Sequence, residues 1–217
     1  MTPSQTPQVA DNGLTQTEGE ILVHTARQAI ATYLLQHRLI PSPNQSTPRL
    51  RAKSGVFVTL NTVRPAHELR GCIGFPYPEA PLIESTIRAA VYAATEDPRF
   101  PPVSFDEFNR SVAVEVTALT QPKPLETKDR KKLPEMIVIG THGLIIEGMG
   151  SSGLLLPQVA TEWNWDSSEF LTNCCMKAGL SPDSWLLDGV KVKIFQGEIF
   201  EELEPAGNVR RKAIGGR

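Results

Sequence analysis

The sequence predicts an α+β protein with a mainly antiparallel sheet flanked by helices. A β-branched run at residues 55–63 is followed, after the loop at 64–67, by a second strand-like run at 68–75, which is typical of an antiparallel hairpin with a longer loop. Apolar residues recur at four-residue steps between residues 17 and 37, which is the spacing of an amphipathic helix. The segments that follow mix helical and strand-like patterns without the regular βαβ rhythm of a parallel sheet.

The composition predicts one domain between two polar ends. Residues 1–16 are rich in Thr, Gln, Pro and Asn, which predicts a disordered tail. The apolar periodic segments fall within residues 17–205, which form the expected domain. Residues 206–217 combine glycine with Arg and Lys and are typical of a flexible basic tail.

The first half of the domain contains two predicted helices around the hairpin. The first helix runs from Thr17 to about His37, and Glu20 completes a capping box with Thr17. The hairpin follows, and Pro81 then suits the first turn of a second helix. This second helix ends near Asp97, directly before a proline.

A capping pattern and an alternating run open the second half. Ser104 and Glu107 predict the start of a short helix. Apolar residues then alternate along 112–118, which indicates a half-buried strand. Short strands are predicted at 136–139 and 144–147.

Two short helices and a final strand complete the expected domain. One helix follows Pro157, and another begins at Asp166 with Glu169 as its reciprocal capping partner. Val190 opens the last strand, in which Gly197 marks a bulge or a turn.

Composition and charge narrow the possible partners and compartment. The 217 residues carry 22 basic and 24 acidic side chains, so we expect no nucleic-acid partner. No apolar run approaches the roughly 20 residues that span a bilayer, and the first residues lack a signal-peptide core, so we expect no membrane partner. Three cysteines give no disulfide framework, which favours the reducing cytoplasm.

The main candidate site lies in the segment 68–75. Side chains alternate along a strand, so Arg70 and Cys72 share one face. A cation beside a thiol favours the thiolate, which makes Cys72 a candidate nucleophile with Arg70 lowering its pKa. Alternatively, Cys72 fills a crowded hairpin and Arg70 anchors an anion. Gly71 and Gly74 predict close approach of another backbone or a ligand.

His142 is the candidate base for Cys72. It lies between glycines at a predicted turn, and a Cys–His pair is one way to activate a thiol. The alternative is an ordinary turn histidine.

Three further side chains are candidates for substrate or anion binding. Arg99 either clamps an anion or forms an ion pair that organises its proline-rich loop. Gln158 and Glu162 lie one helical turn apart and either face a cleft together or belong to a solvated helix face.

Metals and cofactors are not expected. The spacings His-x-x-x-His, Cys-x-x-Cys and His-x-His do not occur, so the sequence predicts no metal site. Residues 148–153 match Gly-x-Gly-x-x-Gly, but Pro157 interrupts at the point where a dinucleotide site needs a helix. We interpret this run as a glycine-rich turn.

Eight segments together resemble a known family, and the hexapeptide LRGCIG at 69–74 is the most specific of them. The segments are GVFVTL at 55–60, LRGCIG at 69–74, DPRF at 97–100, GTHGL at 140–144, GLLLPQV at 153–159, WD at 165–166, EFL at 169–171 and KAGL at 177–180. Their order and content resemble the AMMECR-one domain family, also called AmmeMemoRadiSam system protein A in prokaryotes. The resemblance covers about residues 18–203.

The resemblance implies a larger and a smaller lobe around a shared cleft. It also implies association with a Memo-like protein and a radical SAM protein, but it supplies no established reaction. Two hypotheses follow. One is an enzyme, or an enzyme component, that uses Cys72, Arg70 and His142. The other is a non-catalytic binding or scaffold protein for a small anionic ligand or a protein partner.

Overall fold

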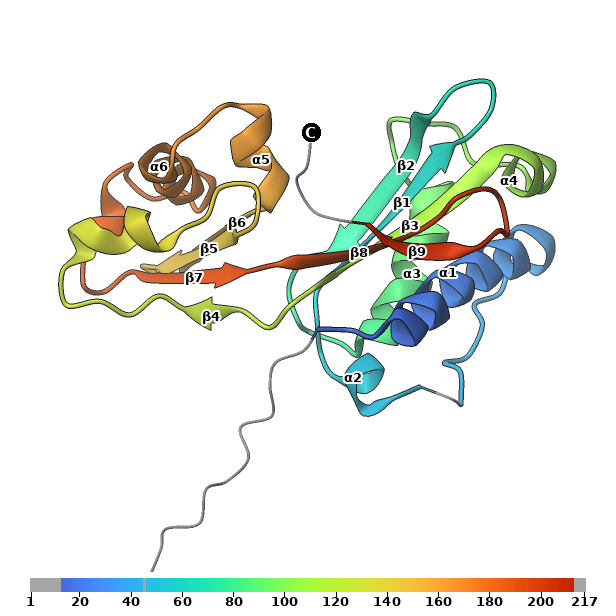
Figure 1. Ribbon diagram of the computed structural model, residues 1–217, viewed down its shortest axis with the longest axis horizontal. Coiled ribbons are helices and arrows are strands. Elements are labelled where there is room, and N and C mark those ends of the chain that lie inside the picture. The colour runs from blue at the N-terminus through green and yellow to red at the C-terminus, as the bar shows by residue number, and fades with distance from the viewer. Residues whose placement is uncertain (1–12, 45, 213–217) are drawn as a thin grey trace, which may run out of the picture.

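The structure is a computed structural model that describes residues 13–44 and 46–212. It confirms the α+β class, with helices packed on two antiparallel sheets in a larger and a smaller lobe (Figure 1). The strand order is β2-β1-β3-β8-β9 in the five-stranded sheet of the larger lobe and β4-β7-β5-β6 in the four-stranded sheet of the smaller lobe.

The larger lobe combines both ends of the described chain. Its elements are α1 (Gln16–Gln36), α2 (Pro48–Arg51), β1 (Val56–Thr62), β2 (Glu68–Phe75), α3 (Leu82–Thr95), α4 (Phe105–Ser111), β3 (Val112–Leu119), β8 (Gly197–Glu202) and β9 (Val209–Lys212). The elements of the smaller lobe are β4 (Lys123–Pro124), the 3-10 helix η1 (Arg130–Met136), β5 (Gly143–Gly148), β6 (Ser151–Leu155), α5 (Pro157–Glu162), α6 (Ser167–Lys177), the 3-10 helix η2 (Ser184–Leu186) and β7 (Lys191–Phe195).

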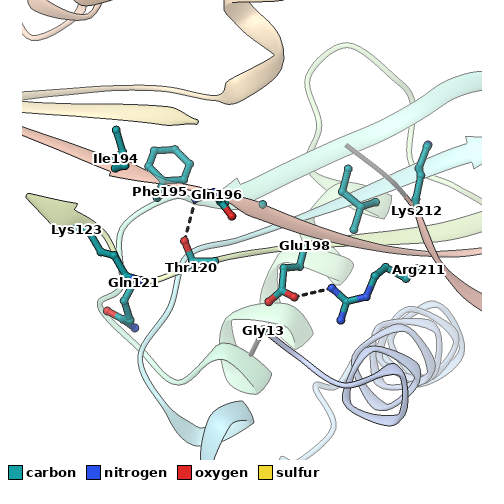
Figure 2. A pocket seen from close by; sticks show the side chains of 12 residues that line it. Gly13, Thr120, Gln121, Lys123, Ile194, Phe195, Gln196, Glu198, Arg211 and Lys212 are labelled. Carbon is teal, nitrogen blue, oxygen red and sulfur yellow. Dashed lines mark hydrogen bonds and ion pairs between the residues drawn. The ribbon is translucent and has the colours of Figure 1, made fainter. Parts of the chain in front are cut away.

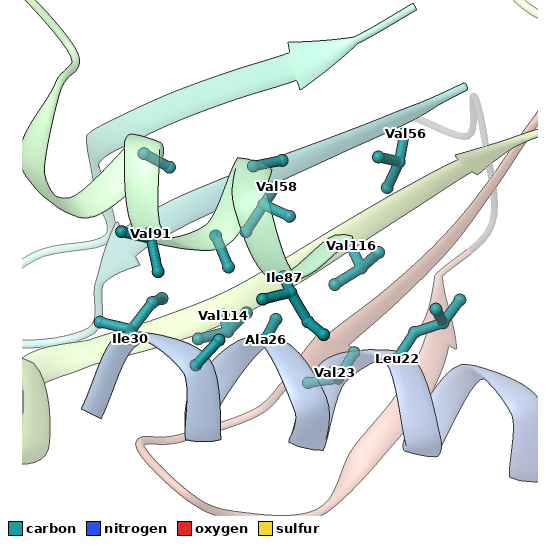
Figure 3. Close-up of a cluster of buried hydrophobic side chains, with 14 of the residues drawn as sticks. Leu22, Val23, Ala26, Ile30, Val56, Val58, Ile87, Val91, Val114 and Val116 are labelled. Carbon is teal, nitrogen blue, oxygen red and sulfur yellow. The ribbon is translucent and has the colours of Figure 1, made fainter. Parts of the chain in front are cut away.

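The main core lies between α1, α3 and one face of the five-stranded sheet (Figure 3). Leu22, Ala26 and Ile30 follow the four-residue spacing of α1 and are fully buried. They pack with α3 against strand residues such as Val58 and Val114. Burying each large apolar side chain contributes roughly 1.5–3 kcal/mol. Because both long helices cover the same face, the other face of the sheet is left to border the cleft.

The smaller lobe has its own core, in which α6 packs on the four-stranded sheet. Phe170 and Leu171 of α6 are fully buried with Ile146 of β5. Cys174 and Cys175 are also fully buried in this core, so both adjacent cysteines fill space inside the lobe.

The chain crosses between the lobes twice. The final strand predicted from Val190 is in fact two strands, because β7 belongs to the smaller sheet and β8 to the larger one (Figure 1). Gln196 lies between them and accepts a hydrogen bond from the Thr120 amide at 2.8 Å. The Gln196 amide donates to Thr120 Oγ1, also at 2.8 Å. These two bonds join the crossing segments to each other.

The predicted hairpin and most of the helix starts are confirmed. Strands β1 and β2 pair antiparallel, and Asp166 and Glu169 form the capping box of α6. The first capping box was placed two residues late, because Thr15 and Glu18 form it and α1 begins at Gln16. The predicted N-terminal tail therefore does not reach residue 16, and its residues 1–12 lie outside the described part of the chain.

Two other predictions are corrected. No strand forms at 136–139, where η1 ends at Met136 and a turn leads to β5, so the carbonyl of Val138 bonds within this turn. The predicted flexible tail at 206–217 contains β9, which pairs with β8. Three acidic side chains of the larger sheet, which include Glu201, pair with the basic residues of β9. Residues 213–217 lie outside the described chain.

Candidate functional site

The hexapeptide forms most of β2, an edge strand of the larger sheet. Gly71 faces α3 so closely that a Cβ there would lie 2.2 Å from the carbonyl oxygen of Ala93. At Gly74, a Cβ would lie 2.2 Å from the ring of Phe57 on the neighbouring strand. At both positions, a residue larger than glycine would clash with these neighbouring atoms. Gly71 allows the helix to approach, and Gly74 allows the Phe57 ring to lie across β2.

Asp97 and Arg99 cap the free edge of β2 at Cys72. The buried Asp97 carboxylate accepts a hydrogen bond from the Cys72 amide at 2.8 Å, and Arg99 Nη2 donates to the Cys72 carbonyl at 3.4 Å. Arg99 also forms an ion pair with Asp97 at 2.7 Å, and this partner holds the pKa of Asp97 well below its usual range. The geometry matches the organising ion pair expected as one of two roles for Arg99. It also protects an edge strand from wrong pairing.

Arg70 is held away from the thiol by α4. Its Nε and Nη2 donate to the two oxygens of Glu107 at 2.5 and 3.1 Å, and its Nη1 donates to the Pro101 carbonyl at 2.9 Å. Only 12% of the Arg70 side chain is exposed. The charged groups that act on the thiol are instead those of Arg99, Asp97 and Glu115.

The Cys72 thiol is not activated. It is half-buried and accepts a hydrogen bond from Thr59 Oγ1 at 3.3 Å. Burial raises the pKa of Cys72, and the nearby carboxylates of Asp97 and Glu115 add to this rise, which Thr59 and Arg99 only partly offset. The expected lowering of the Cys72 pKa by Arg70 is therefore wrong. The surroundings of the thiol therefore favour its protonated form over the thiolate.

His142 lies in the turn that leads into β5 in the smaller lobe. Its Nδ1 accepts a hydrogen bond from the Val138 amide at 3.1 Å, and burial lowers the pKa of its imidazole. Across residues 13–44 and 46–212, no hydrogen bond joins His142 to Cys72, and His142 is not among the residues that line the cavity at Cys72. The Cys–His pair therefore gains no support from this geometry.

A cavity of about 310 Å³ lies between the two lobes, and we call it the interlobe cavity. The larger lobe lines it with the side of its sheet opposite α1 and α3, and the smaller lobe with the start of α5. Its lining residues are Phe57, Thr59, Cys72, Glu115, Thr117, Leu119, Leu156, Pro157, Gln158, Gly197, Ile199 and Lys212. Cys72 and Gln158 therefore border the same space, whereas Glu162 is exposed and lies outside the lining.

An ion pair forms the charged part of the cavity wall. Lys212 Nζ lies 2.7 Å from Glu115 Oε2, and 3.0 Å from Glu201 Oε2. Neither Glu115 nor Lys212 was a candidate from the sequence. The alternation along 112–118 did place Glu115 on the polar face of its strand, but Lys212 was assigned to the tail.

A second cavity, of about 370 Å³, lies where the chain crosses between the lobes (Figure 2). Thr120, Gln121 and Gln196 line it from the crossing segments, and it shares Lys212 with the interlobe cavity. Several of its polar side chains already have partners within the protein. Arg211 Nη1, for example, lies 2.7 Å from Glu198 Oε1.

Neither a metal cluster nor a membrane helix is found in the described part of the chain. Among these residues, no group of three or more His, Cys, Asp or Glu side chains is arranged to hold a metal ion. None of the described helices combines the length and the apolar character that a membrane span requires.

Fold and cavity together define a two-lobed α+β protein with a pocket between its lobes. A family model described as AMMECR1 matches residues 23–200. The chain belongs to this AMMECR1 family, which confirms the resemblance carried by the hexapeptide and its companion segments.

Relatives from archaea support this assignment. A protein of Thermococcus gammatolerans is 52% identical over 198 residues, which are 90% of this chain and 96% of that protein. A protein of Pyrococcus furiosus is also 52% identical over 198 residues, covering 90% of this chain and 93% of its own length. The crystal structure of an uncharacterized protein from Pyrococcus horikoshii matches with a TM-score of 0.75 and 48% identity. That match covers 92% of this chain and 98% of the crystallised one.

Proposed function

We propose that the protein is a non-catalytic binding protein that holds a small organic molecule in the interlobe cavity. The observation that carries this proposal is the cavity itself, which both lobes line and which Cys72 borders. Its volume of about 310 Å³ falls in the lower part of the range of small-molecule sites.

The chemistry of the wall is that of a ligand pocket. Apolar side chains, including Phe57, Leu156 and Ile199, make up much of it. Five of the twelve lining residues carry polar side-chain groups, namely Thr59, Glu115, Thr117, Gln158 and Lys212, and such groups fix the orientation of a ligand in a mostly apolar site. Because Leu156 and Gln158 come from the smaller lobe, a ligand would contact both lobes at once.

The enzyme hypothesis needs an activated Cys72, and the surroundings oppose this. A thiol nucleophile reacts as the thiolate, so burial beside the carboxylates of Asp97 and Glu115 disfavours the reactive form. Arg70, the expected activating cation, is paired with Glu107. An anion-binding role for Arg70 is disfavoured for the same reason.

Cys72 offers a built-in reporter of ligand binding. Cys174 and Cys175 are both 0% exposed, so iodoacetamide should alkylate the folded protein at Cys72. We expect indole, cyclohexanol or benzamide, used as probes, to slow this alkylation by occupying the cavity. The proposal fails if none of them protects Cys72 at concentrations up to the solubility limit.

Two variants of α5 make a matched pair for this experiment. Gln158→Trp places a large side chain at the cavity, whereas Glu162→Trp places the same side chain one turn further on, outside the lining. We expect Gln158→Trp to abolish the protection by the probes and Glu162→Trp to keep it. Equal protection in both variants would show that the probes bind elsewhere.

We further infer from family membership that the protein works in the cytoplasm with Memo-like and radical SAM proteins. The AMMECR1 assignment supports this inference, as do the three free cysteines, which suit a reducing compartment. A pull-down with the Memo-like and radical SAM proteins of the same organism tests it. The absence of both partners from the eluate would contradict it.

A further inference from the structure

We propose that the ligand of the interlobe cavity is a zwitterion with an apolar body, namely an α-amino acid with an apolar side chain. This inference rests on the proposed binding function and names the class of ligand. It is carried by the ion pair in the wall, where a carboxylate and an ammonium group lie 2.7 Å apart and both border the cavity.

The two charges are suited to the two ends of an amino acid. The Glu115 carboxylate is an acceptor for a ligand ammonium group, and Lys212 Nζ is a donor for a ligand carboxylate. The amino and carboxylate groups of an α-amino acid are joined through a single carbon, so they can meet two neighbouring wall charges at the same time. Each of the two wall groups would therefore still have a partner of opposite charge when the ligand is bound.

A second carboxylate, that of Glu201, keeps Lys212 in place during such an exchange. Glu201 Oε2 lies 3.0 Å from Lys212 Nζ, and Arg210 Nη2 lies 2.7 Å from Glu201 Oε1. Glu201 is only 8% exposed and does not line the cavity, so it remains with Lys212 when Glu115 turns to a ligand.

The balance of these charges disfavours ligands with a net charge. Glu115, Glu201, Arg210 and Lys212 sum to zero at neutral pH. An anion would compete with two carboxylates for Lys212, and a cation would compete with Lys212 for Glu115. A zwitterion adds no net charge, and it replaces one ion pair by two in a partly desolvated site.

The rest of the wall suits an apolar side chain. Phe57, Leu119, Leu156 and Ile199 also line the cavity. Thr59, Thr117 and Gln158 also line it and can donate to or accept from the ligand's polar end.

The test compares amino acids with analogues that lack one charge. L-leucine, L-methionine and L-phenylalanine are titrated by calorimetry and by protection of Cys72 from alkylation. For leucine, 3-methylbutylamine lacks the carboxylate and 4-methylpentanoate lacks the amine. We expect at least one of the three amino acids to bind, and its one-charge analogues to bind at least about tenfold more weakly, since each loses a charge-assisted hydrogen bond.

Substitutions of Glu115 and Lys212 should then show which end of the ligand each residue binds. Glu115→Gln should weaken the amino acid at least about tenfold, whereas the amine-free analogue should bind at least as tightly as before, because one carboxylate that competes for Lys212 is gone. Lys212→Met should weaken the amino acid similarly, whereas the carboxylate-free analogue should bind at least as tightly as before, because it no longer competes with Lys212 for Glu115. The controls are Glu147→Gln and Lys193→Met, because this pair has the same 2.7 Å separation in the smaller lobe and lies outside the cavity lining.

The outcomes distinguish this inference from the binding function on which it rests. If one-charge analogues bind as tightly as the amino acids, or if only uncharged probes protect Cys72, the zwitterion is overturned and the binding function stands. If no compound of either kind protects Cys72, both fail. Circular dichroism and thermal unfolding of Glu115→Gln and Lys212→Met show whether a loss of binding reflects a loss of folding.

Discussion

The carboxylate of Asp97 accepts the backbone amide hydrogen of Cys72 at 2.8 Å and so takes the place of a neighbouring strand. Arg99 completes this substitute, because it pairs with Asp97 and donates to the Cys72 carbonyl. Two of the segments that carried the resemblance, LRGCIG at 69–74 and DPRF at 97–100, are therefore joined by these bonds. The second segment caps the free edge of the first.

This cap predicts a stability effect of Asp97→Asn. The substitution removes the charge that pairs with Arg99 and weakens the bond to the Cys72 amide, so we expect a loss of about 1.5–3 kcal/mol in the free energy of unfolding. Urea unfolding at pH 7 measures it. Asp106→Asn is the control, because its ion pair with Arg110 is highly exposed, and it should cost little.

The same cap predicts a dependence on acid. The pKa of Asp97 is lowered in the folded state, so its stabilisation is fully present above its unfolded pKa and is lost as the pH falls through the folded value. The wild-type protein should therefore lose more stability between pH 5 and acid conditions than Asp97→Asn does. Parallel stability curves for the two proteins over that range would contradict this.

The pKa of the Cys72 thiol should be higher than that of an ordinary thiol. Burial raises its pKa above the usual 9.0, so the rate of its alkylation should still be increasing beyond pH 9. The raised folded pKa also means that its contribution to stability is present below the unfolded pKa and is lost as the pH rises through the folded value. Rates are measured with iodoacetamide, with Cys72→Ser as the background. A plateau below pH 8 would restore the nucleophile hypothesis.

Arg70→Ala should lower the stability of the protein without changing the reactivity of the Cys72 thiol. Arg70 loses its bonds to Glu107 and Pro101, so we expect the free energy of unfolding to fall by about 1–3 kcal/mol. The alkylation profile of Cys72 should not move, because Arg70 is not among the charges that act on the thiol. A clear rise in the Cys72 pKa of this variant would return Arg70 to the role first expected.

Gly71→Ala should destabilise the larger lobe strongly. Its new methyl group would lie 2.2 Å from the Ala93 carbonyl oxygen, and this backbone atom can move only with α3. We expect a cost of about 1–3 kcal/mol or more, measured by thermal or urea unfolding. Gly189→Ala is the matched control, because no heavy atom lies within 4 Å of a Cβ built there. Similar costs for both variants would show that the contact is not the cause.

Much of the fold was predictable because its signals are local. The hairpin of β1 and β2, the helix opening near Pro81 and the capping box of Asp166 and Glu169 each depend on neighbouring residues. The first helix was also found, although Thr15 caps it where Thr17 was expected, since both begin a Thr-x-x-Glu pattern.

The site was less predictable because its partners are distant in the sequence. Arg70 and Cys72 were expected to interact, but Glu107 lies 37 residues from Arg70 and takes its guanidinium group. Lys212 reaches Glu115 across 97 residues through the pairing of β9, and no local pattern predicts that pairing. Alternation within a strand assigns a face to a residue but does not say which distant side chain will meet it there.

The register of β3 and β8 has a consequence for how the two lobes are related. Leu119 and Gly197 are directly paired, so the whole smaller lobe, residues 120–196, is an insertion at the tip of an antiparallel hairpin. A two-residue Asn-Gly turn could in principle close that hairpin. The larger lobe would then keep its helices, its complete sheet and the Glu115–Lys212 pair, while Leu156, Pro157 and Gln158 would be removed. The two walls of the interlobe cavity thus come from separate segments of one chain.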